Sequence, residues 1–226
     1  MYLFIKRFFD IVFSFIGLMI LLPIFLVIAI LLRFTGEGEV FYLQQRVGFK
    51  KRIFGIWKFA TMLKNSPTME GGLITLKKDP RLTPLGGFLR TSKINELPQL
   101  INILIGDMSF VGPRPVMKKS FDAYPKDVQE VIYNVKPGLT GVGSVVFRDE
   151  ETMITKVQNE GGDTWEFYIT QIYPYKGRLE KWYQEHQSFK TDVLLLWLTF
   201  WHIVSPESNM VNKIFPDLPK IDSLPA

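Results

Sequence analysis

The pair Asn95-Glu96 is the first place in the chain where side chains could do chemistry. Leu97 and Pro98 follow, and then an apolar stripe at helical spacing that stops at Gly106. Because proline is tolerated only in the first turn of a helix, this pattern predicts Asn95 as the helix N-cap. Glu96 at the positive end of that helix suits a role that faces a phosphate or a metal ion.

A second candidate is Arg114, which lies between Pro113 and Pro115 near the end of the segment Met108–Pro115. The two prolines restrict the backbone, so the guanidinium is presented rigidly, and arginine binds phosphate through two parallel hydrogen bonds. We therefore predict that Arg114 binds a phosphate of the substrate. Further candidate ligands for phosphate or head groups are Arg90, Lys58, Arg46 and Arg148.

The composition limits the metals and the partners. The chain has no cysteine and two histidines, which excludes disulfides and multi-histidine zinc sites. Any metal would be a hard ion with oxygen ligands, and Mg²⁺ bound by Glu96 and Asn95 is the natural candidate. The net charge of +5 indicates an anionic partner, either lipid head groups or a phosphorylated substrate. Nucleic acid is disfavoured, because the basic residues cluster beside an apolar segment rather than on a groove-reading motif.

That apolar segment runs from Phe8 to Leu32 and is long enough to cross a bilayer. Pro23 lies near its middle, where it removes a backbone hydrogen bond and kinks a helix. Basic residues flank both ends, which places both ends in the cytoplasm. A re-entrant membrane helix kinked at Pro23 satisfies both observations, and a bitopic helix with a tolerated kink is the alternative.

The remaining segments indicate a mixed α/β domain. Glu39–Met62 alternates apolar and polar residues around a turn at Gly48, which predicts a β-hairpin that carries Arg46 and Lys58. Asp192–Val204 is too short to span a bilayer, so it is either an interfacial helix or a core helix. We predict a membrane helix at residues 1–35, a cytoplasmic α/β domain with interfacial helices at 36–205, and an extended tail at 206–226.

In this order, the segments resemble the bacterial sugar transferases, the monotopic polyprenyl-phosphate hexose-1-phosphate transferases, also called phosphoglycosyl transferases. The resemblance is carried by KRFFD, the Pro23 helix, QQRVG, KFATM, DPRLTPLGGFLR, NELPQL, GDMSFVGPRP and KPGLTG. It implies a re-entrant helix and transfer of a sugar 1-phosphate from a nucleotide sugar, usually UDP-linked, to undecaprenyl phosphate, with release of UMP. It also implies Mg²⁺, membrane lipids as partners, and a place at the cytoplasmic face of the bacterial inner membrane. The reaction would initiate exopolysaccharide, lipopolysaccharide or other glycoconjugate synthesis, and a homodimer stays open.

The chain departs from the family at Asn95, where an aspartate usually attacks the sugar nucleotide, and at Ala60, where an arginine is usual. Four interpretations of Asn95 stand: an engineered loss of the nucleophile, a natural non-catalytic scaffold, replacement by Glu96, or replacement by a carboxylate of 149–151 beside Arg148. We predict a sugar-phosphate transferase with Glu96 and Asn95 at the catalytic position. The alternative is a catalytically disabled membrane scaffold with the same fold.

Overall fold

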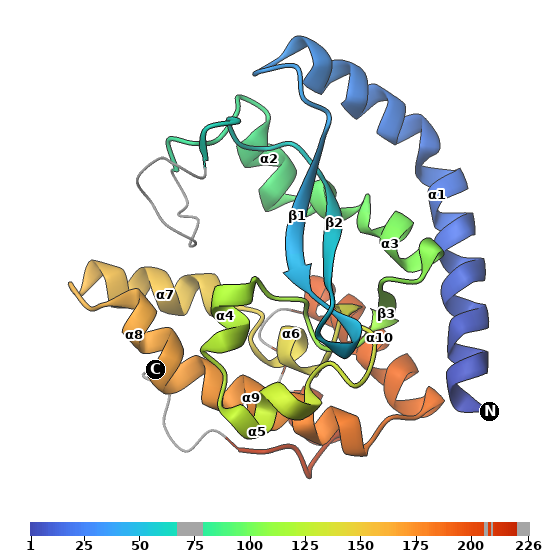
Figure 1. Cartoon of the computed structure of the whole chain (residues 1–226), viewed down its shortest axis with the longest axis vertical. Helices are drawn as coiled ribbons and strands as arrows, with labels where there is room; N and C mark the ends of the chain where they lie inside the picture. The colour runs from blue at the N-terminus through green and yellow to red at the C-terminus, as the bar shows by residue number, and fades with distance from the viewer. Residues whose placement is uncertain (67–78, 206–207, 209, 221–226) are drawn as a thin grey trace. The chain divides into compact units, whose positions relative to one another are not determined.

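A computed structural model describes residues 1–66, 79–205, 208 and 210–220. The chain divides into two units. Unit 1 comprises Met1–Arg7, Arg46–Phe54 and Asp107–Ala226, and unit 2 comprises Phe8–Gln45 and Gly55–Gly106. Helices and strands both occur along the chain (Figure 1), so the predicted mixed α/β class is confirmed.

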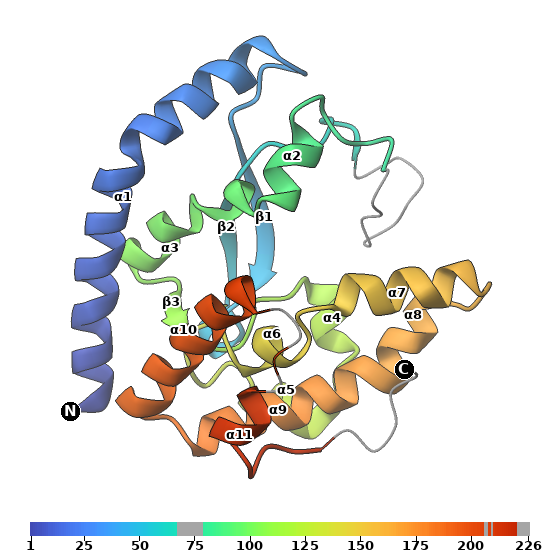
Figure 2. The ribbon, with the colours of Figure 1, turned by 180° about the vertical axis from the view of Figure 1, so that it is seen from behind.

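The helix α1 (Tyr2–Phe34) is continuous and contains Pro23. Figures 1 and 2 show that it curves along its length. At 1.5 Å per residue its 33 residues extend about 50 Å, beyond the roughly 30 Å of a hydrocarbon core. It is long and apolar enough to cross a membrane, and most of its apolar side chains are exposed. Such a surface needs an apolar environment, which indicates membrane association. The re-entrant path stays a prediction.

Unit 2 packs α1 against the base of the predicted β-hairpin. β1 (Phe41–Val47) and β2 (Ile53–Phe59) form a two-stranded sheet, joined by the turn η1 (Phe49–Lys51), which confirms the hairpin. The unit continues with α2 (Gly86–Thr91), η3 (Ile94–Glu96) and α3 (Gln99–Ile105). Its core contains Phe25, Ile28, Leu32, Phe59 and Leu89.

Unit 1 is built around two short parallel strands and a set of helices. β3 (Ser109–Val111) pairs with β4 (Gly138–Thr140), with Ser109 opposite Gly138. The helix α10 (Phe189–Val204) packs on both strands and on α6 (Val142–Val146) (Figure 2). The helical elements are α4 (Lys118–Asp122), α5 (Lys126–Val131), α6 (Val142–Val146), α7 (Glu150–Asn159), α8 (Thr164–Phe167), the π-helix η4 (Tyr168–Ile172), α9 (Tyr173–Glu185), α10 (Phe189–Val204) and α11 (Met210–Ile214).

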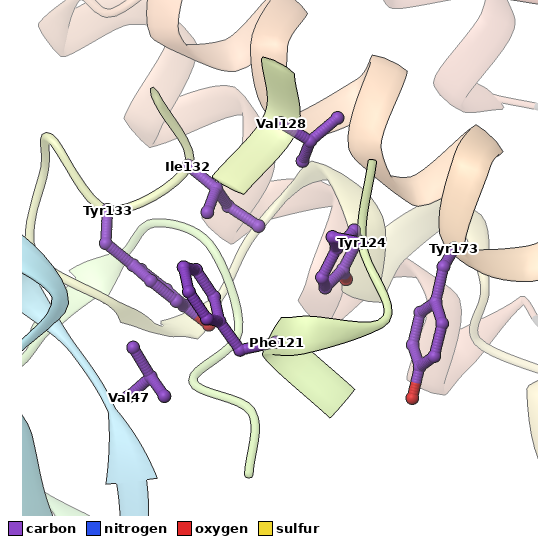
Figure 3. Close-up of a cluster of buried hydrophobic side chains, with 7 residues drawn as sticks. All are labelled: Val47, Phe121, Tyr124, Val128, Ile132, Tyr133 and Tyr173. Atoms are coloured by element: carbon purple, nitrogen blue, oxygen red, sulfur yellow. The ribbon is translucent and has the colours of Figure 1, made fainter. Parts of the chain in front are cut away.

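Figure 3 shows a core cluster of unit 1, in which aromatic rings from α4, α9 and the segments that flank α5 meet. The ring of Tyr133 stacks on Phe121 at 5.8 Å between centroids, and Tyr124 lies 4.8 Å from Tyr173. The cluster comprises Val47, Phe121, Tyr124, Val128, Ile132, Tyr133 and Tyr173. It therefore holds the tip of the hairpin, α4, α5 and the start of α9 together.

The segment predicted as an extended tail contains α11, a helix of five residues. Val211 and Phe215 are buried and lie four residues apart, so one helical face packs inward. The prediction of an extended chain is therefore wrong at Met210–Ile214. Residues 206–207, 209 and 221–226 of the tail lie outside the described residues. The division into three segments stays a prediction.

Candidate active site

Asn95 and Glu96 lie in η3, a single 3₁₀ turn that precedes α3. Lys93 adopts a left-handed conformation with φ of 59° before this turn, and α3 begins only at Gln99, with Pro98 as its N-cap residue. The predicted N-cap role of Asn95 is wrong. Pro98 has no N–H for a continuous α-helix, so the chain first winds through tighter three-residue turns.

The structure brings two predicted site residues of unit 2 together. Lys58 on β2 places its ammonium 3.4 Å from the Glu96 carboxylate, and both side chains are about five-sixths buried. Glu96 is thus oriented by a cation from the hairpin rather than by a helix end. An ammonium at this position can also neutralise a phosphate oxygen.

Asn95 itself is buried, with 6% of its surface exposed. Its Oδ1 atom has no hydrogen-bond partner among the described residues. Leaving a buried amide oxygen unpaired costs about 1–3 kcal/mol, so such an atom is a candidate ligand-binding group.

Asn95 and Glu96 offer oxygen ligands of the kind that Mg²⁺ prefers. Mg²⁺ commonly takes one or two carboxylates and completes its shell with waters and substrate phosphates. Within the described part of the chain no group of three His, Asp or Glu side chains could hold a metal. A magnesium ion here would therefore depend on the substrate for its remaining ligands.

Asn102 frames this region and was not predicted from the sequence. It is fully buried, donates from Nδ2 to the Gly55 carbonyl at 2.8 Å, and accepts from the Trp57 N–H at 2.9 Å. It thus fastens α3 to β2, one residue from Lys58. Its position as a polar residue within the apolar sequence of α3 could have identified it from the sequence. Arg90, half-buried on α2, belongs to the same unit.

Arg114 lies in unit 1, exposed between the buried Pro113 and Pro115, as the paired prolines predict. The Tyr133 hydroxyl donates to the Arg114 carbonyl at 2.9 Å and accepts from the Val116 N–H at 3.1 Å. Tyr133 is 1% exposed, so both bonds are shielded from water. The backbone of Arg114 is therefore fixed from both sides, while its side chain faces solvent.

The loop that carries Arg114 is also supported by close backbone packing, which Gly112 and Gly138 make possible. A Cβ on Gly112 would lie 2.3 Å from the Lys136 carbonyl, and one on Gly138 would lie 2.1 Å from the Gly112 nitrogen. The Gly138 N–H donates to the Pro113 carbonyl at 2.9 Å. The segments GPRP and KPGLTG therefore lie side by side, with no space for a side chain between them.

Arg46 approaches the same loop from the end of β1. Its Nη1 atom lies 3.5 Å from the Pro115 carbonyl, and the neighbouring Val47 N–H donates to the Val116 carbonyl at 2.9 Å. The structure thus brings Arg46 and Arg114 to one loop of unit 1.

The carboxylates after Arg148 already have cationic partners. Asp149 pairs with Arg148 at 2.5 Å, and Glu150 pairs with Lys176 at 2.6 Å. Arg148 also approaches the His202 carbonyl at 3.4 Å. The Glu151 side chain lies outside the described residues. The structure therefore places Asn95, Glu96, Lys58 and Arg90 in unit 2, and Arg46, Arg114 and Arg148 in unit 1.

Glu180 is a buried acid of unit 1. Burial raises its pKa to about 8, although the Lys176 ammonium and the Gly143 N–H both lower it. Its Oε2 atom has no partner among the described residues. Glu180 is therefore expected to carry its proton at neutral pH.

Lys6 has a role that the sequence did not predict. Its ammonium lies 2.5 Å from Asp192, donates to the Val111 carbonyl at 2.8 Å, and lies 3.2 Å from the Tyr183 hydroxyl. The Tyr2 hydroxyl donates to the same carboxylate at 2.7 Å. This network ties the first residues of α1 to β3, α9 and α10. Lys6 is thus an internal ion-pair partner rather than a free flanking charge.

Comparison with known proteins identifies the chain's relatives. A family model described as bacterial sugar transferase matches residues 1–206. The exopolysaccharide production protein ExoY of Rhizobium meliloti is 36% identical over 167 residues, which cover 67% of this chain and 73% of the relative.

Two longer relatives match through part of their length. The undecaprenyl-phosphate galactose phosphotransferase of Salmonella typhimurium is 33% identical over 211 residues, covering 87% of this chain and 40% of the relative. The UDP-glucose:undecaprenyl-phosphate glucose-1-phosphate transferase of Klebsiella pneumoniae is 35% identical over 158 residues, covering 68% and 33% respectively.

Proposed function

Because the chain belongs to the bacterial sugar transferase family, we propose that it transfers a sugar 1-phosphate from a UDP-sugar to undecaprenyl phosphate and releases UMP. The chain is an enzyme of the phosphoglycosyl transferase class. Relatives named as undecaprenyl-phosphate transferases support the lipid acceptor, and the Klebsiella relative's name supports a UDP-linked donor. The name of the Rhizobium relative supports a role in exopolysaccharide production.

The observation that carries the proposal is the Lys58–Glu96 pair beside the buried Asn95. Glu96 is a carboxylate adjacent to the position where the family usually has its nucleophile. Asp149 and Glu150 are held in closer ion pairs, at 2.5 and 2.6 Å. Glu96, which lies next to Asn95, is therefore the better candidate to attack phosphorus.

The reaction proceeds in two displacements. A Glu96 oxygen bonds to the β-phosphorus, and the bond from that phosphorus to the bridging oxygen breaks, so UMP leaves with the bridging oxygen. A phosphate oxygen of the lipid then attacks the same phosphorus and frees the Glu96 carboxylate. The product is undecaprenyl diphosphate sugar.

The other residues bind phosphate charge. Lys58 neutralises the oxygens of the attacked phosphate, and the Asn95 amide can donate to one of them. Mg²⁺, when bound, supplies further charge neutralisation, and Asn95 and Glu96 are the residues that would hold it. In unit 1, Arg114 is the proposed ligand for a phosphate of the nucleotide, because its backbone is fixed and its guanidinium is exposed.

We propose that α1 is re-entrant, with its ends at the cytoplasmic face of the bacterial inner membrane. We also propose that α10 lies at the membrane surface. On one of its faces Leu195 and Leu198 are fully buried, while the opposite face is exposed. The exposed apolar residues of that face are Phe189, Val193, Leu196, Trp197, Phe200 and Val204. The membrane surface would cover them.

A second candidate function is a membrane scaffold that binds the sugar nucleotide without turning it over. Asn95 itself favours this alternative, because an amide cannot attack phosphorus as a carboxylate does.

The test incubates the full chain in nanodiscs with undecaprenyl phosphate and a panel of UDP-sugars. The transferase is expected to form UMP and lipid-linked sugar in equal amounts. Continued turnover is expected only when undecaprenyl phosphate is present. Binding of a UDP-sugar without UMP would establish the scaffold and contradict the transferase. Arg114→Ala is expected to abolish binding or turnover, and near-normal activity would remove Arg114 from the site.

A further inference from the structure

Two aromatic side chains of unit 1 have no part in the phosphate chemistry above. Trp165 on α8 and Tyr168 at the start of η4 are both half-buried. Their ring centroids lie 6.2 and 5.3 Å from that of Tyr173, which belongs to the core cluster in Figure 3. Both rings are therefore anchored on one side and partly open on the other.

The backbone at this place is unusual. Residues Tyr168–Ile172 form the π-helix η4 between α8 and α9. Such segments are rare and occur frequently at functional sites. The π-turn begins at Tyr168.

Charged groups surround the two rings. The Lys119 ammonium lies 4.7 Å from the centre of the Trp165 ring. The Glu150 carboxylate pairs with Lys176 at 2.6 Å and is hydrogen-bonded to the Tyr168 hydroxyl. Burial, followed by the charge of Glu150, raises the pKa of Tyr168 well above its usual value, so its hydroxyl stays protonated and donates to Glu150.

Arg114 lies close enough to Tyr168 to oppose this effect electrostatically, lowering the pKa that burial raises. The same core cluster supports both groups, because Tyr133 fixes the Arg114 backbone and Tyr173 supports the Tyr168 ring. A ligand phosphate on Arg114 would therefore lie near Tyr168, while Trp165 packs against Tyr173 and Glu150 acts on Tyr168 within the same unit.

We propose that Glu150, Trp165 and Tyr168 recognise the sugar of the nucleotide sugar, next to the phosphate bound by Arg114. The inference rests on the proposed function and adds the residues that read the substrate. Aromatic faces pack on the apolar C–H face of a sugar ring, and a carboxylate accepts hydrogen bonds from its hydroxyls. Uracil fits this set less well, because it presents two carbonyl acceptors and a single N–H donor.

The experiment measures dissociation constants of the full chain in nanodiscs for UDP and for UDP-glucose, UDP-galactose and their N-acetyl forms. Glu150→Gln keeps the shape of the side chain and removes its charge. Tyr168→Phe keeps the ring and removes the hydroxyl. Glu166→Gln, an exposed acid next to Trp165 on α8, is the matched control.

Glu150→Gln is expected to weaken the preferred UDP-sugar roughly tenfold and Tyr168→Phe less, while UDP stays within about twofold for both. The control is expected to change neither. Equal losses for UDP and UDP-sugar, or no loss for either variant, would overturn the inference. If the parent binds UDP but gains nothing from the sugar, the sugar site is absent while the nucleotide site stands. If the parent binds neither ligand, the proposed function fails first and the inference with it.

Discussion

The two units hold their candidate site residues in opposite ways. In unit 2, Asn95 is buried with an amide oxygen that has no partner among the described residues, and Glu96 pairs with Lys58. In unit 1, Arg114 is exposed, and its backbone is fastened by Tyr133. One unit thus buries the reactive side chains, whereas the other fixes a main-chain loop and exposes the side chain.

This difference shows where each unit is sensitive. A change of side chain at Asn95 alters the chemistry while the turn around it can persist. The position of Arg114 depends instead on residues distant from it in sequence, above all Tyr133 and Lys6, whose ammonium binds the carbonyl of Val111. Substitutions at Tyr133 and Lys6 are therefore expected to change stability or the position of the loop without removing a group that reacts.

The largest expected effect is in unit 1, from Lys6→Met. This change removes one partner of a largely buried ion pair and leaves Asp192 without its cation, which costs about 4 kcal/mol. Thermal or denaturant unfolding of the full chain in detergent measures the loss. Lys126→Met, at an exposed lysine of the same unit, serves as the control. Equal stability of the two variants would show that the Lys6 network contributes little.

A pH-dependent effect of similar size is expected from Glu180. Its pKa is about 8 in the folded chain and 4.5 in the unfolded chain, so the folded state binds more protons between these values. The free energy of unfolding therefore falls as the pH rises from 4.5 to 8, by on the order of 3 kcal/mol, and Glu180→Gln removes this fall.

Unfolding of parent and Glu180→Gln at pH 5 and pH 8 checks the sign. Glu185→Gln, an exposed acid on the same helix, is expected to follow the parent. A parent that is more stable at pH 8 than at pH 5, relative to Glu180→Gln, would contradict the buried protonated acid.

In unit 2, Asn102→Ala is expected to cost about 2 kcal/mol, because the Gly55 carbonyl and the Trp57 N–H both lose their partner. The Lys58–Glu96 distance depends on this frame, so UMP release should fall as well. Ile105→Ala, an exposed position on the same helix, controls for the loss of side-chain volume. Unchanged stability and turnover would remove Asn102 from the frame.

The smallest expected effect, from Tyr133→Phe in unit 1, tests whether the position of the Arg114 loop matters apart from the stability of the core. Tyr133→Phe removes two hydrogen bonds to the Arg114 loop and should raise KM for the sugar nucleotide about fivefold, with kcat changed less. Tyr124→Phe removes a hydroxyl from the same core cluster and leaves the Tyr133 bonds to the Arg114 loop in place. If both variants change KM alike, the effect belongs to the core and not to the loop.

Local patterns predicted the parts of the fold that local chemistry determines. The hairpin around Gly48 and the end of α3 at Gly106, with φ of 100°, follow from turn residues and periodicity. The N-cap at Asn95 failed because Pro98 separates a 3₁₀ turn from the helix. The break between the 3₁₀ turn and the helix depends on the single N–H that Pro98 lacks. A hydrophobic pattern does not resolve such a break.

The supports of the site could not be predicted in the same way. Lys6 and Asp192 are 186 residues apart, and Tyr133 reaches a carbonyl 19 residues earlier. No local spacing records such contacts, because they depend on how distant elements pack. The order of the motifs predicted the family, which the family model confirms, and the roles of the individual site residues stay predictions.

The most direct test of the account compares initial rates of UMP release in nanodiscs with undecaprenyl phosphate and the preferred UDP-sugar. The parent, Glu96→Gln and Asn95→Asp are measured together. We predict that the parent turns over with Asn95 in place and that Glu96→Gln lowers its rate about a hundredfold or more. A silent parent whose activity appears only in Asn95→Asp would contradict it and make the chain a transferase without its nucleophile.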